Sequence, residues 1–426
     1  MNKTKLTWLF GFALFAGFFG AGNLILPPHL GFNSGTDWWL VALGFMATAT
    51  FIPLLALFGH ARLQGTILDF GKKVSPFFSV VYGFCVILIA ISLPCPRTAA
   101  VTHEMSIQPY FNISSLVTST VYFILVLLFA IKRSKALDIL SKILTPLIVL
   151  IILTIILLGI FGPTNTMNPS TFEAPFIDGF LEGYQTYDAI AGVLMGGIVI
   201  VSLNQFGQFS VIEKKKIIAR SGLIAMLGLF LIYAGLIALG AVYNSEFPND
   251  ISRTELLLGL STKTLGNIGT TFLSVLVGLA CFSTAVAIVV SAADVCKSYF
   301  NNSQKVYVIT SVVVCIIGVL VGQFDVHYII NVALPALMFI YPITIVLIAL
   351  NILPEKWTST SVFRIVILIT FLFSIPDFLG LMIESDWLTQ LKNNIPLAKD
   401  NLGWVLPAFL TFILLNLKNF TTKVSA

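Results

Sequence analysis

The segment whose residue types best suit binding chemistry is Phe15-Ala16-Gly17-Phe18-Phe19-Gly20-Ala21-Gly22-Asn23. It lies between Leu6 and Thr36, where the sequence contains no Asp, Glu, Lys or Arg. Three glycines followed by Asn23 and by Pro27-Pro28 disfavour an unbroken helix. Either neighbouring helices pack closely on these glycines, or the helix opens and exposes backbone N–H and C=O groups. An opened helix at membrane depth can bind ions and small zwitterions.

A second segment, Ala280-Cys281-Phe282-Ser283-Thr284, places two hydroxyl groups next to each other in an apolar stretch. Together with the carbonyl of Ala280 they can contact a small hard cation, which prefers several oxygen ligands. Alternatively, both hydroxyls donate to carbonyls of their own helix and only ease helix packing.

Three ionisable residues also fall within apolar stretches, where charge is costly and marks candidate functional positions. Arg97 either reaches the membrane surface, as long basic side chains do, or pairs with Glu104 or with a carboxylate of the apolar stretch 178–204. Glu182 and Asp188 either line a water-filled vestibule, gate it by pairing, bind a cation or proton, or have a structural role.

The composition shows which class of protein carries these residues. The chain has 426 residues, of which 57% are hydrophobic and 10% charged, whereas soluble chains carry about 25% charge. We therefore expect an all-α polytopic membrane protein. No metal motif or nucleophile–base pair points to an enzyme. The sequence gives no reason to expect an organic cofactor, a nucleic-acid partner or an obligate protein partner.

A helix needs about 20 apolar residues to cross a bilayer, and on that rule the sequence predicts twelve spans. They cover residues 6–30, 38–61, 75–101, 115–131, 143–162, 178–204, 221–243, 267–296, 306–323, 327–350, 365–383 and 402–417.

Charge placement gives the predicted orientation. With the N-terminus in the cytoplasm, most of the 24 Lys and Arg residues fall in cytoplasmic loops, as the positive-inside rule requires. Both termini are then cytoplasmic, and the basic run Lys214-Lys215-Lys216 is a loop anchor.

The span count divides the chain into three parts. Residues 1–162 and 163–351 each hold five spans, and residues 352–426 hold two more. An odd number of spans per repeat inserts the second repeat upside down, with the binding site between broken helices. The second candidate for a broken helix is the sixth span, whose segment 178–189 contains two glycines and three carboxylates.

Three motifs together resemble the bacterial branched-chain amino acid:cation symporters, the BrnQ-like or LIVCS family, over essentially the whole chain. They are Gly20-Ala21-Gly22-Asn23-Leu24-Ile25-Leu26-Pro27-Pro28, Pro96-Arg97-Thr98-Ala99-Ala100 and Glu182-Gly183-Tyr184 with Thr186 and Asp188-Ala189. More distantly, the chain is similar to LeuT-like transporters. The resemblance implies a secondary transporter in the bacterial inner membrane. It further implies import of leucine, isoleucine and valine with sodium, by alternating access around the first and sixth spans.

The resemblance also implies ion ligands. One sodium ion is expected between the first and eighth spans, held by the carbonyls of Ala16, Phe19 and Ala280 and the hydroxyls of Ser283 and Thr284. A second is expected at the carbonyl of Phe18 and the side chain of Asn23, with its other ligands not placed.

The amino acid substrate is expected to place its carboxylate at the N–H groups of Gly20, Ala21 and Gly22, because the start of a helix attracts anions. Its ammonium is expected at the carbonyls of Ala16 or Phe19 and at the opened part of the sixth span. The predicted substrate-binding residues are Phe18, Gly20, Ala21, Gly22, Asn23, Tyr184 and Thr186.

Two alternatives keep the same scaffold. In the first, the coupling ion is a proton carried by Glu182 or Asp188, and Arg97 belongs to the same gate or proton site. In the second, the protein is a channel or a receptor, although the charged residues do not repeat along one face of several spans as a polar pore requires.

Overall fold

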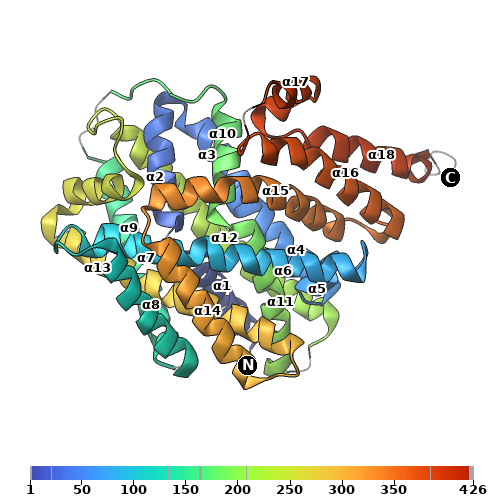
Figure 1. Ribbon diagram of the computed structural model, residues 1–426, viewed down its shortest axis with the longest axis horizontal. Helices are drawn as coiled ribbons and strands as arrows, with labels where there is room; N and C mark the ends of the chain where they lie inside the picture. Colours follow the sequence, from blue (N-terminus) through green and yellow to red (C-terminus); the bar gives the residue numbers. More distant parts are fainter. Residues whose placement is uncertain are drawn as a thin grey trace.

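The computed structural model describes residues 2–20, 22–132, 135–162, 166–207, 209–383 and 385–421. These residues form helices and, within these ranges, no β-strand (Figure 1). The predicted all-α class is therefore confirmed.

The helices of the first part of the chain are α1 (Lys3–Phe18), α2 (Gly22–Ser34), α3 (Trp38–Met46), α4 (Ile52–Leu63), α5 (Ile67–Gly71), α6 (Pro76–Ser92), α7 (Pro94–Thr102), α8 (Ser115–Lys132) and α9 (Lys135–Ile160). Those of the remainder are α10 (Pro175–Glu182), α11 (Asp188–Phe206), α12 (Val211–Val242), α13 (Arg253–Tyr299), α14 (Gln304–Gly322), α15 (Val326–Ile352), α16 (Thr360–Leu379), α17 (Asp386–Asn394) and α18 (Val405–Thr421). Short single turns lie between them: η1 (Gly35–Asp37), η2 (Ala47–Phe51), η3 (His103–Ile107), η4 (Gly183–Thr186), η5 (Glu355–Trp357) and η6 (Ala398–Asp400).

Among the described residues, eight helical segments are long and apolar enough to cross a membrane, or nine if the bent pair Pro175–Thr186 and Asp188–Asn204 forms one span. Two shorter apolar helices, Leu144–Ile160 and Val405–Leu417, lie where the fifth and twelfth spans were predicted. The chain is thus a multi-pass helical membrane protein, and the number of twelve spans stays a prediction.

The uncharged first segment consists of two helices. α1 ends at Phe18 and α2 begins at Gly22, with Gly20 between them. Pro27 and Pro28 lie inside α2 and do not end it. The glycines, not the prolines, therefore set the position of the break.

The second interrupted segment is also a pair of helices. α10 ends at Glu182, η4 follows, and α11 begins at Asp188, with a bend of 44° between the two halves. Tyr187, at the junction, has a left-handed backbone with φ 63°, which is uncommon for a residue with a bulky side chain. Both predicted interruptions are present in the structure.

Two other segments differ from their predicted boundaries. α13 begins at Arg253, but Gly266 has φ 69° and divides it, so its second part begins where the span 267–296 was predicted. α12 begins at Val211, ten residues before the predicted span, because Ser210 and Glu213 form a capping box there. The basic run after Glu213 is therefore helical.

α12 lies at the centre of the bundle and packs against α1, α2, α3, α4 and α9 (Figure 1). Its contact with α2 is made backbone to backbone. A Cβ atom on Gly31 would lie 1.8 Å from the carbonyl oxygen of Ile237, and one on Gly240 would lie 1.9 Å from that of Pro28. Glycine at these positions lets α12 hold the second half of the broken helix closely.

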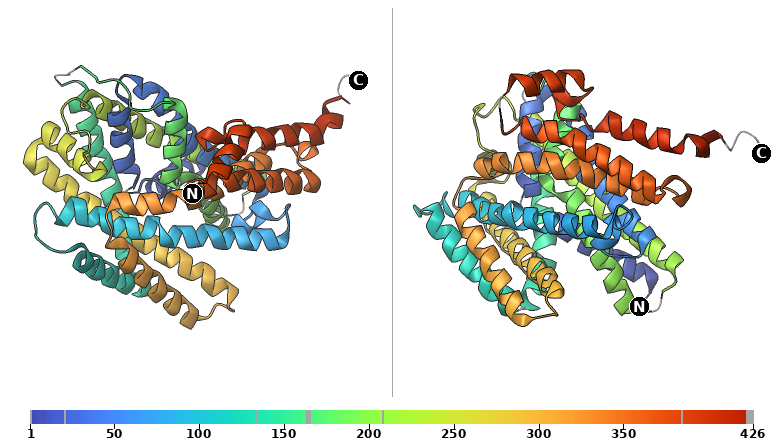
Figure 2. Two further views of the ribbon diagram at one scale, coloured as in Figure 1. Left: turned by 45° about the horizontal axis from the view of Figure 1, so that its top comes forward. Right: turned by 45° about the vertical axis from the view of Figure 1, so that its right-hand side comes forward.

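The last three helices lie together at one side of the molecule (Figures 1 and 2). α16 packs against α15, α17 and α18. The division at residues 162/163 and 351/352 into two repeats and an added pair stays a prediction, and residues 163–165 lie outside the described part.

Candidate functional site

A cavity of about 160 Å³ lies between the two helix breaks. It is lined by parts of α1, α2, α6, α7, η4, α11 and α13, segments that are far apart in the sequence. Its apolar wall includes Ile89, Ile190, Leu194 and Ile288. The residues of the predicted site that line it are Phe18, Gly20, Gly22, Asn23, Arg97, Thr186, Asp188 and Thr284.

Some backbone groups at the first break form hydrogen bonds with one another. The N–H of Gly20 donates to the carbonyl of Phe18 at 2.9 Å, and the N–H of Asn23 donates to the carbonyl of Gly20 at 3.1 Å. The N–H of Gly20, expected to face a substrate carboxylate, is therefore engaged within the chain in this structure. A Cβ on Gly20 would meet no atom within 4 Å, so this position faces open space. Ala21 lies outside the described residues.

Asn23 is the centre of a buried polar cluster. Its amide nitrogen lies 2.8 Å from the carbonyl oxygen of Phe18, 3.0 Å from each carboxylate oxygen of Asp188, and at hydrogen-bond distance from the hydroxyl of Tyr233. That hydroxyl donates to Asp188 at 3.0 Å. An amide nitrogen carries two hydrogens, so these four oxygens exceed what it can satisfy. The cluster joins α1, α2, α11 and α12.

Two residues of the second break, Thr186 and Tyr184, were predicted to bind substrate, and they lie in different surroundings. Thr186 lines the cavity, where its hydroxyl donates to the carbonyl of Gly183 at 2.9 Å and accepts from the N–H of Asp188 at 3.2 Å. Tyr184 instead lies outside the lining of the cavity. Its fully buried ring stacks on Tyr341 with 4.3 Å between ring centres, so in this structure it is a packing residue.

Arg97 lies at the cavity and links the two breaks. Its Nη1 donates to the carbonyl of Gln185 at 2.9 Å, and its Cζ lies 5.3 Å from the centre of the Tyr187 ring. On its other side is the start of α2, because a Cβ on Gly22 would lie 2.0 Å from Nη2. A side chain at position 22 would therefore displace the guanidinium.

Neither glutamate considered for this region lines the cavity. Glu182 pairs with Arg253 at 3.3 Å, and Arg253 also donates to the side-chain oxygen of Gln185 at 2.9 Å. Glu104 accepts from the hydroxyl of Thr254 at 2.6 Å rather than pairing with Arg97. Of the roles considered for Glu182, the structure shows ion pairing, and the partner is Arg253.

The predicted sodium ligands are only partly assembled. Thr284 lines the cavity. The hydroxyl of Ser283 donates to the carbonyl of Ala280 at 2.9 Å, which is the back-bonding alternative considered for this segment. Ala16 and Phe19, the two ligands expected from the first break, are not among the described residues that line the cavity.

Sequence reasoning missed four residues of this region. Gln185 and Tyr187 lie within the segment singled out for the second break, and Arg253 falls between the predicted spans 221–243 and 267–296. Tyr233 carried a weak signal, because it places a hydroxyl in the middle of the predicted span 221–243.

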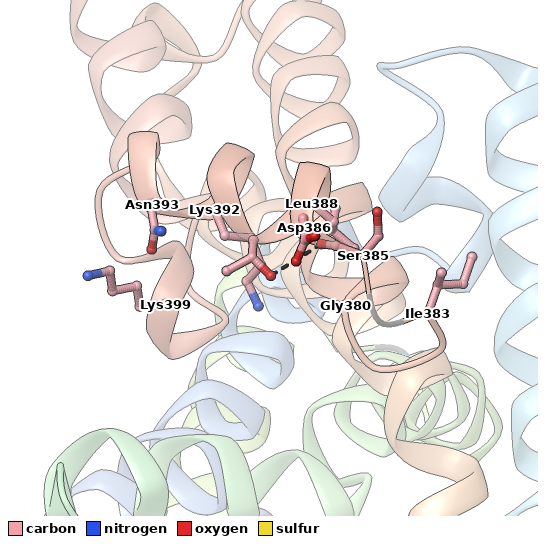
Figure 3. Close-up of a pocket in the computed structure, with 9 residues that line it drawn as sticks. Gly380, Ile383, Ser385, Asp386, Leu388, Lys392, Asn393 and Lys399 are labelled. Atoms are coloured by element: carbon pink, nitrogen blue, oxygen red, sulfur yellow. Dashed lines mark hydrogen bonds between the residues drawn. The ribbon is translucent and has the colours of Figure 1, made fainter.

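A larger hollow of about 810 Å³ is lined by the connection after α16, by α17 and by Lys399 of η6 (Figure 3). Asp386, Lys392 and Lys399 line it, and none of the predicted site residues does. The ammonium of Lys392 also lies 3.9 Å from the buried carboxylate of Asp377.

Comparison with known proteins identifies the family. The family model described as "Branched-chain amino acid transport protein" matches residues 3–421. The chain belongs to this family. Its relatives include the "Branched-chain amino acid transport system 2 carrier protein" of Pseudomonas aeruginosa, 31% identical over 417 residues that cover 95% of this chain and 94% of the relative. Another is the "Branched-chain amino acid permease BraB" of Bacillus subtilis, 33% identical over 423 residues, which cover 95% and 93%.

Solved structures of transporters share the fold. The inward-facing conformation of Mhp1 matches with a TM-score of 0.62 at 13% identity, covering 98% of this chain and 91% of Mhp1. MhsT in complex with L-phenylalanine matches with a TM-score of 0.56 at 16% identity, covering 96% and 97%. This member of the branched-chain amino acid transport family thus has the LeuT-like fold expected from its sequence, and its relatives are carriers and permeases rather than enzymes.

Proposed function

We propose that this chain carries leucine, isoleucine and valine into the cell together with sodium, by alternating access around the two broken helices. The cavity between the breaks carries this proposal, since it combines two interrupted helices, two buried charged residues and an aliphatic wall. The names of the relatives support the substrate class.

The cavity suits a small aliphatic amino acid in size and lining. An apolar cavity of about 150 Å³ holds a molecule the size of benzene, and this one measures about 160 Å³. Ile190, Leu194 and Ile288 supply aliphatic contacts for the side chain. One methylene is worth only about 1–3 kcal/mol of discrimination, so we expect transport of all three branched-chain amino acids.

Sodium is expected at the C-terminal end of α1, where carbonyl groups lose their helical donors. Thr284 faces the same cavity and supplies a hydroxyl oxygen. For Ser283 and Ala280 to join the site, the hydroxyl must rotate away from the carbonyl that now accepts from it. The ion and the amino acid then share one break, which couples their binding.

The oxygens around Asn23 support a second ion position. Asp188 and Tyr233 lie beside Asn23 and the carbonyl of Phe18, and we propose them as the ligands that the sequence left unplaced. The same buried carboxylate also supports a second candidate function, in which Asp188 carries a proton and the coupling ion is H⁺ rather than Na⁺.

The pair between Glu182 and Arg253 is proposed as a gate beside the cavity. Arg253 is joined to α10 and η4 through Glu182 and Gln185. Movement of α13 relative to α10 must break both contacts, so opening on this side requires their separation.

Uptake of radiolabelled leucine into proteoliposomes tests the function. We expect accumulation against the leucine gradient when sodium is higher outside, and none when potassium replaces sodium. Valine and isoleucine should compete. Uptake driven by a pH gradient without sodium, and lost in Asp188→Asn, would instead establish the proton-coupled alternative.

We also propose that the protein lies in the bacterial inner membrane with both termini in the cytoplasm. The arrangement of Lys and Arg supports this orientation. A green fluorescent protein fused to the C-terminus should fluoresce, whereas a periplasmic alkaline phosphatase fused there should be inactive.

A further inference from the structure

Arg97 is a buried cation to which the proposed function assigns no partner. Its side chain is 6% exposed, and a buried charge is costly unless it is paired. Its two neighbours, the Gln185 carbonyl and the Tyr187 ring, are not anions. Among the described residues, no carboxylate oxygen lies within 4.0 Å of a nitrogen of this guanidinium, the distance at which the two groups would form an ion pair.

The guanidinium also lies beside a second source of positive potential, which is the N-terminal end of α2. It lies against Gly22, the first residue of α2. Helix N-termini carry about half a positive charge and unpaired N–H groups. Because Gly20 leaves open space beside this point, an anion in the cavity can reach both the helix end and the side chain.

The cavity is negative at another position. Asp188 is 1% exposed, lines the same cavity, and is held by Asn23 and Tyr233. Its carboxylate repels an anion and attracts an ammonium group. Arg97 and Asp188 therefore give the cavity two fixed charges that are opposite in sign, like the two ends of a zwitterion.

We propose that Arg97 binds the α-carboxylate of the transported amino acid, and that the repulsion from Asp188 orients the substrate so that its carboxylate points to the start of α2. This inference rests on the proposed function. The planar fork of a guanidinium matches the two oxygens of a carboxylate, which a lysine ammonium does not. The specificity that follows is for amino acids over amines of the same shape.

The test is competition against radiolabelled leucine, with sodium present, by unlabelled leucine and by leucinol, which keeps the ammonium and the side chain but lacks the carboxylate. In the wild type we expect leucinol to compete about tenfold to a hundredfold less well, the range for loss of a charge-assisted hydrogen bond. In Arg97→Gln, leucine affinity should fall by a similar factor and leucinol affinity should hold, so their ratio approaches one. Arg97→Lys should restore part of the ratio.

Arg62→Gln is the matched control. Arg62 is half-buried and donates to the backbone carbonyls of Ile352 and Leu353, but it lies outside the lining of the cavity. Its substitution should leave the ratio of leucine to leucinol affinity unchanged, even if transport slows. If Arg97→Gln still binds leucine and its ratio of leucine to leucinol affinity equals that of the wild type, the inference about Arg97 is wrong. The proposed function is not affected by that result.

A second measurement keeps the inference testable if Arg97→Gln does not fold. Phenylglyoxal modifies arginine, and leucine but not leucinol should protect Arg97 of the wild type from it, as mapped by mass spectrometry. Equal protection of Arg97 by leucine and by leucinol overturns the inference. Protection by chloride without leucine also overturns it, because the site then binds an inorganic anion. A wild type that binds no leucine overturns the proposed function itself.

Discussion

At the scale of single residues, Tyr233 is the hydroxyl that completes the cluster around Asp188. It donates to the carboxylate and lies at hydrogen-bond distance from Asn23. Tyr233→Phe should weaken leucine binding about tenfold, because an unpaired buried polar group costs about 1–3 kcal/mol. Competition binding measures this. Tyr328→Phe, at a position 48% exposed, is the control. Equal leucine affinity in both variants would exclude the cluster from the site.

Thr284 gives a separate prediction for the ion. Thr284→Ala removes the hydroxyl of a residue that lines the cavity, so the sodium concentration that half-saturates uptake should rise about tenfold, a loss of roughly one hydrogen-bond-sized interaction. The order of preference among leucine, isoleucine and valine should remain. Thr271→Ala removes an exposed hydroxyl that bonds within the same helix and should change neither quantity. If Thr284→Ala does not change the sodium dependence of uptake, Thr284 is not a ligand of the ion.

The chemistry-bearing residues were predictable where the sequence makes them exceptional. Asn23, Arg97 and Asp188 are polar residues in apolar stretches, and the structure brings all three to one cavity. Tyr233 was not predictable, because a tyrosine in an apolar span is just as compatible with a packing role. Tyr307 is such a case, buried and bonded to the carbonyl of Ala130. Only the packing of α12 against both breaks distinguishes the two tyrosines.

At the scale of elements, the break between α1 and α2 depends on small residues. Gly22→Ala should preserve the fold, since the end of the flexible Arg97 side chain can move away from the new methyl group. That movement should lower leucine affinity while thermal unfolding changes little. Gly11→Ala, whose methyl group would meet the side chain of Ile224 outside the cavity, is the control. If both variants bind leucine equally well, Arg97 does not need its position beside Gly22.

The positions of the breaks followed from the glycines, but their internal hydrogen bonds did not. The sequence indicated free N–H groups at Gly20, whereas the structure turns this group onto the carbonyl of Phe18. Pro27 and Pro28 were expected to weaken the helix, yet α2 continues through them. A proline removes a hydrogen bond without ending a helix when neighbouring helices support it, and α12 gives that support here.

At the scale of the whole molecule, the last helices depend on a buried charge. Asp377 in α16 is fully buried and lies 3.9 Å from Lys392 of α17. Lys392→Met should lower the free energy of unfolding by about 2 kcal/mol, because it leaves a buried carboxylate unpaired. Lys399→Met, an exposed lysine beside the same hollow (Figure 3), should have little effect. Equal thermal unfolding midpoints in the two variants would show that the pair contributes nothing.

The helical class, the family and the LeuT-like fold could be predicted because hydropathy and three motifs determine them. The number of spans could not be fixed in the same way. Helices such as Leu144–Ile160 and Val405–Leu417 are short for a crossing, and interrupted helices divide single spans into pieces. The relation between the two proposed repeats rests on span order, which no residue-level identity between the halves supports.

The most direct measurement is the affinity of the purified protein for leucine as a function of sodium concentration. If the ion and the amino acid share the cavity between the breaks, saturating sodium should raise leucine affinity about 5- to 150-fold, and leucine should raise sodium affinity by the same factor. Leucine affinity that does not change between zero and saturating sodium would contradict a shared, sodium-coupled site.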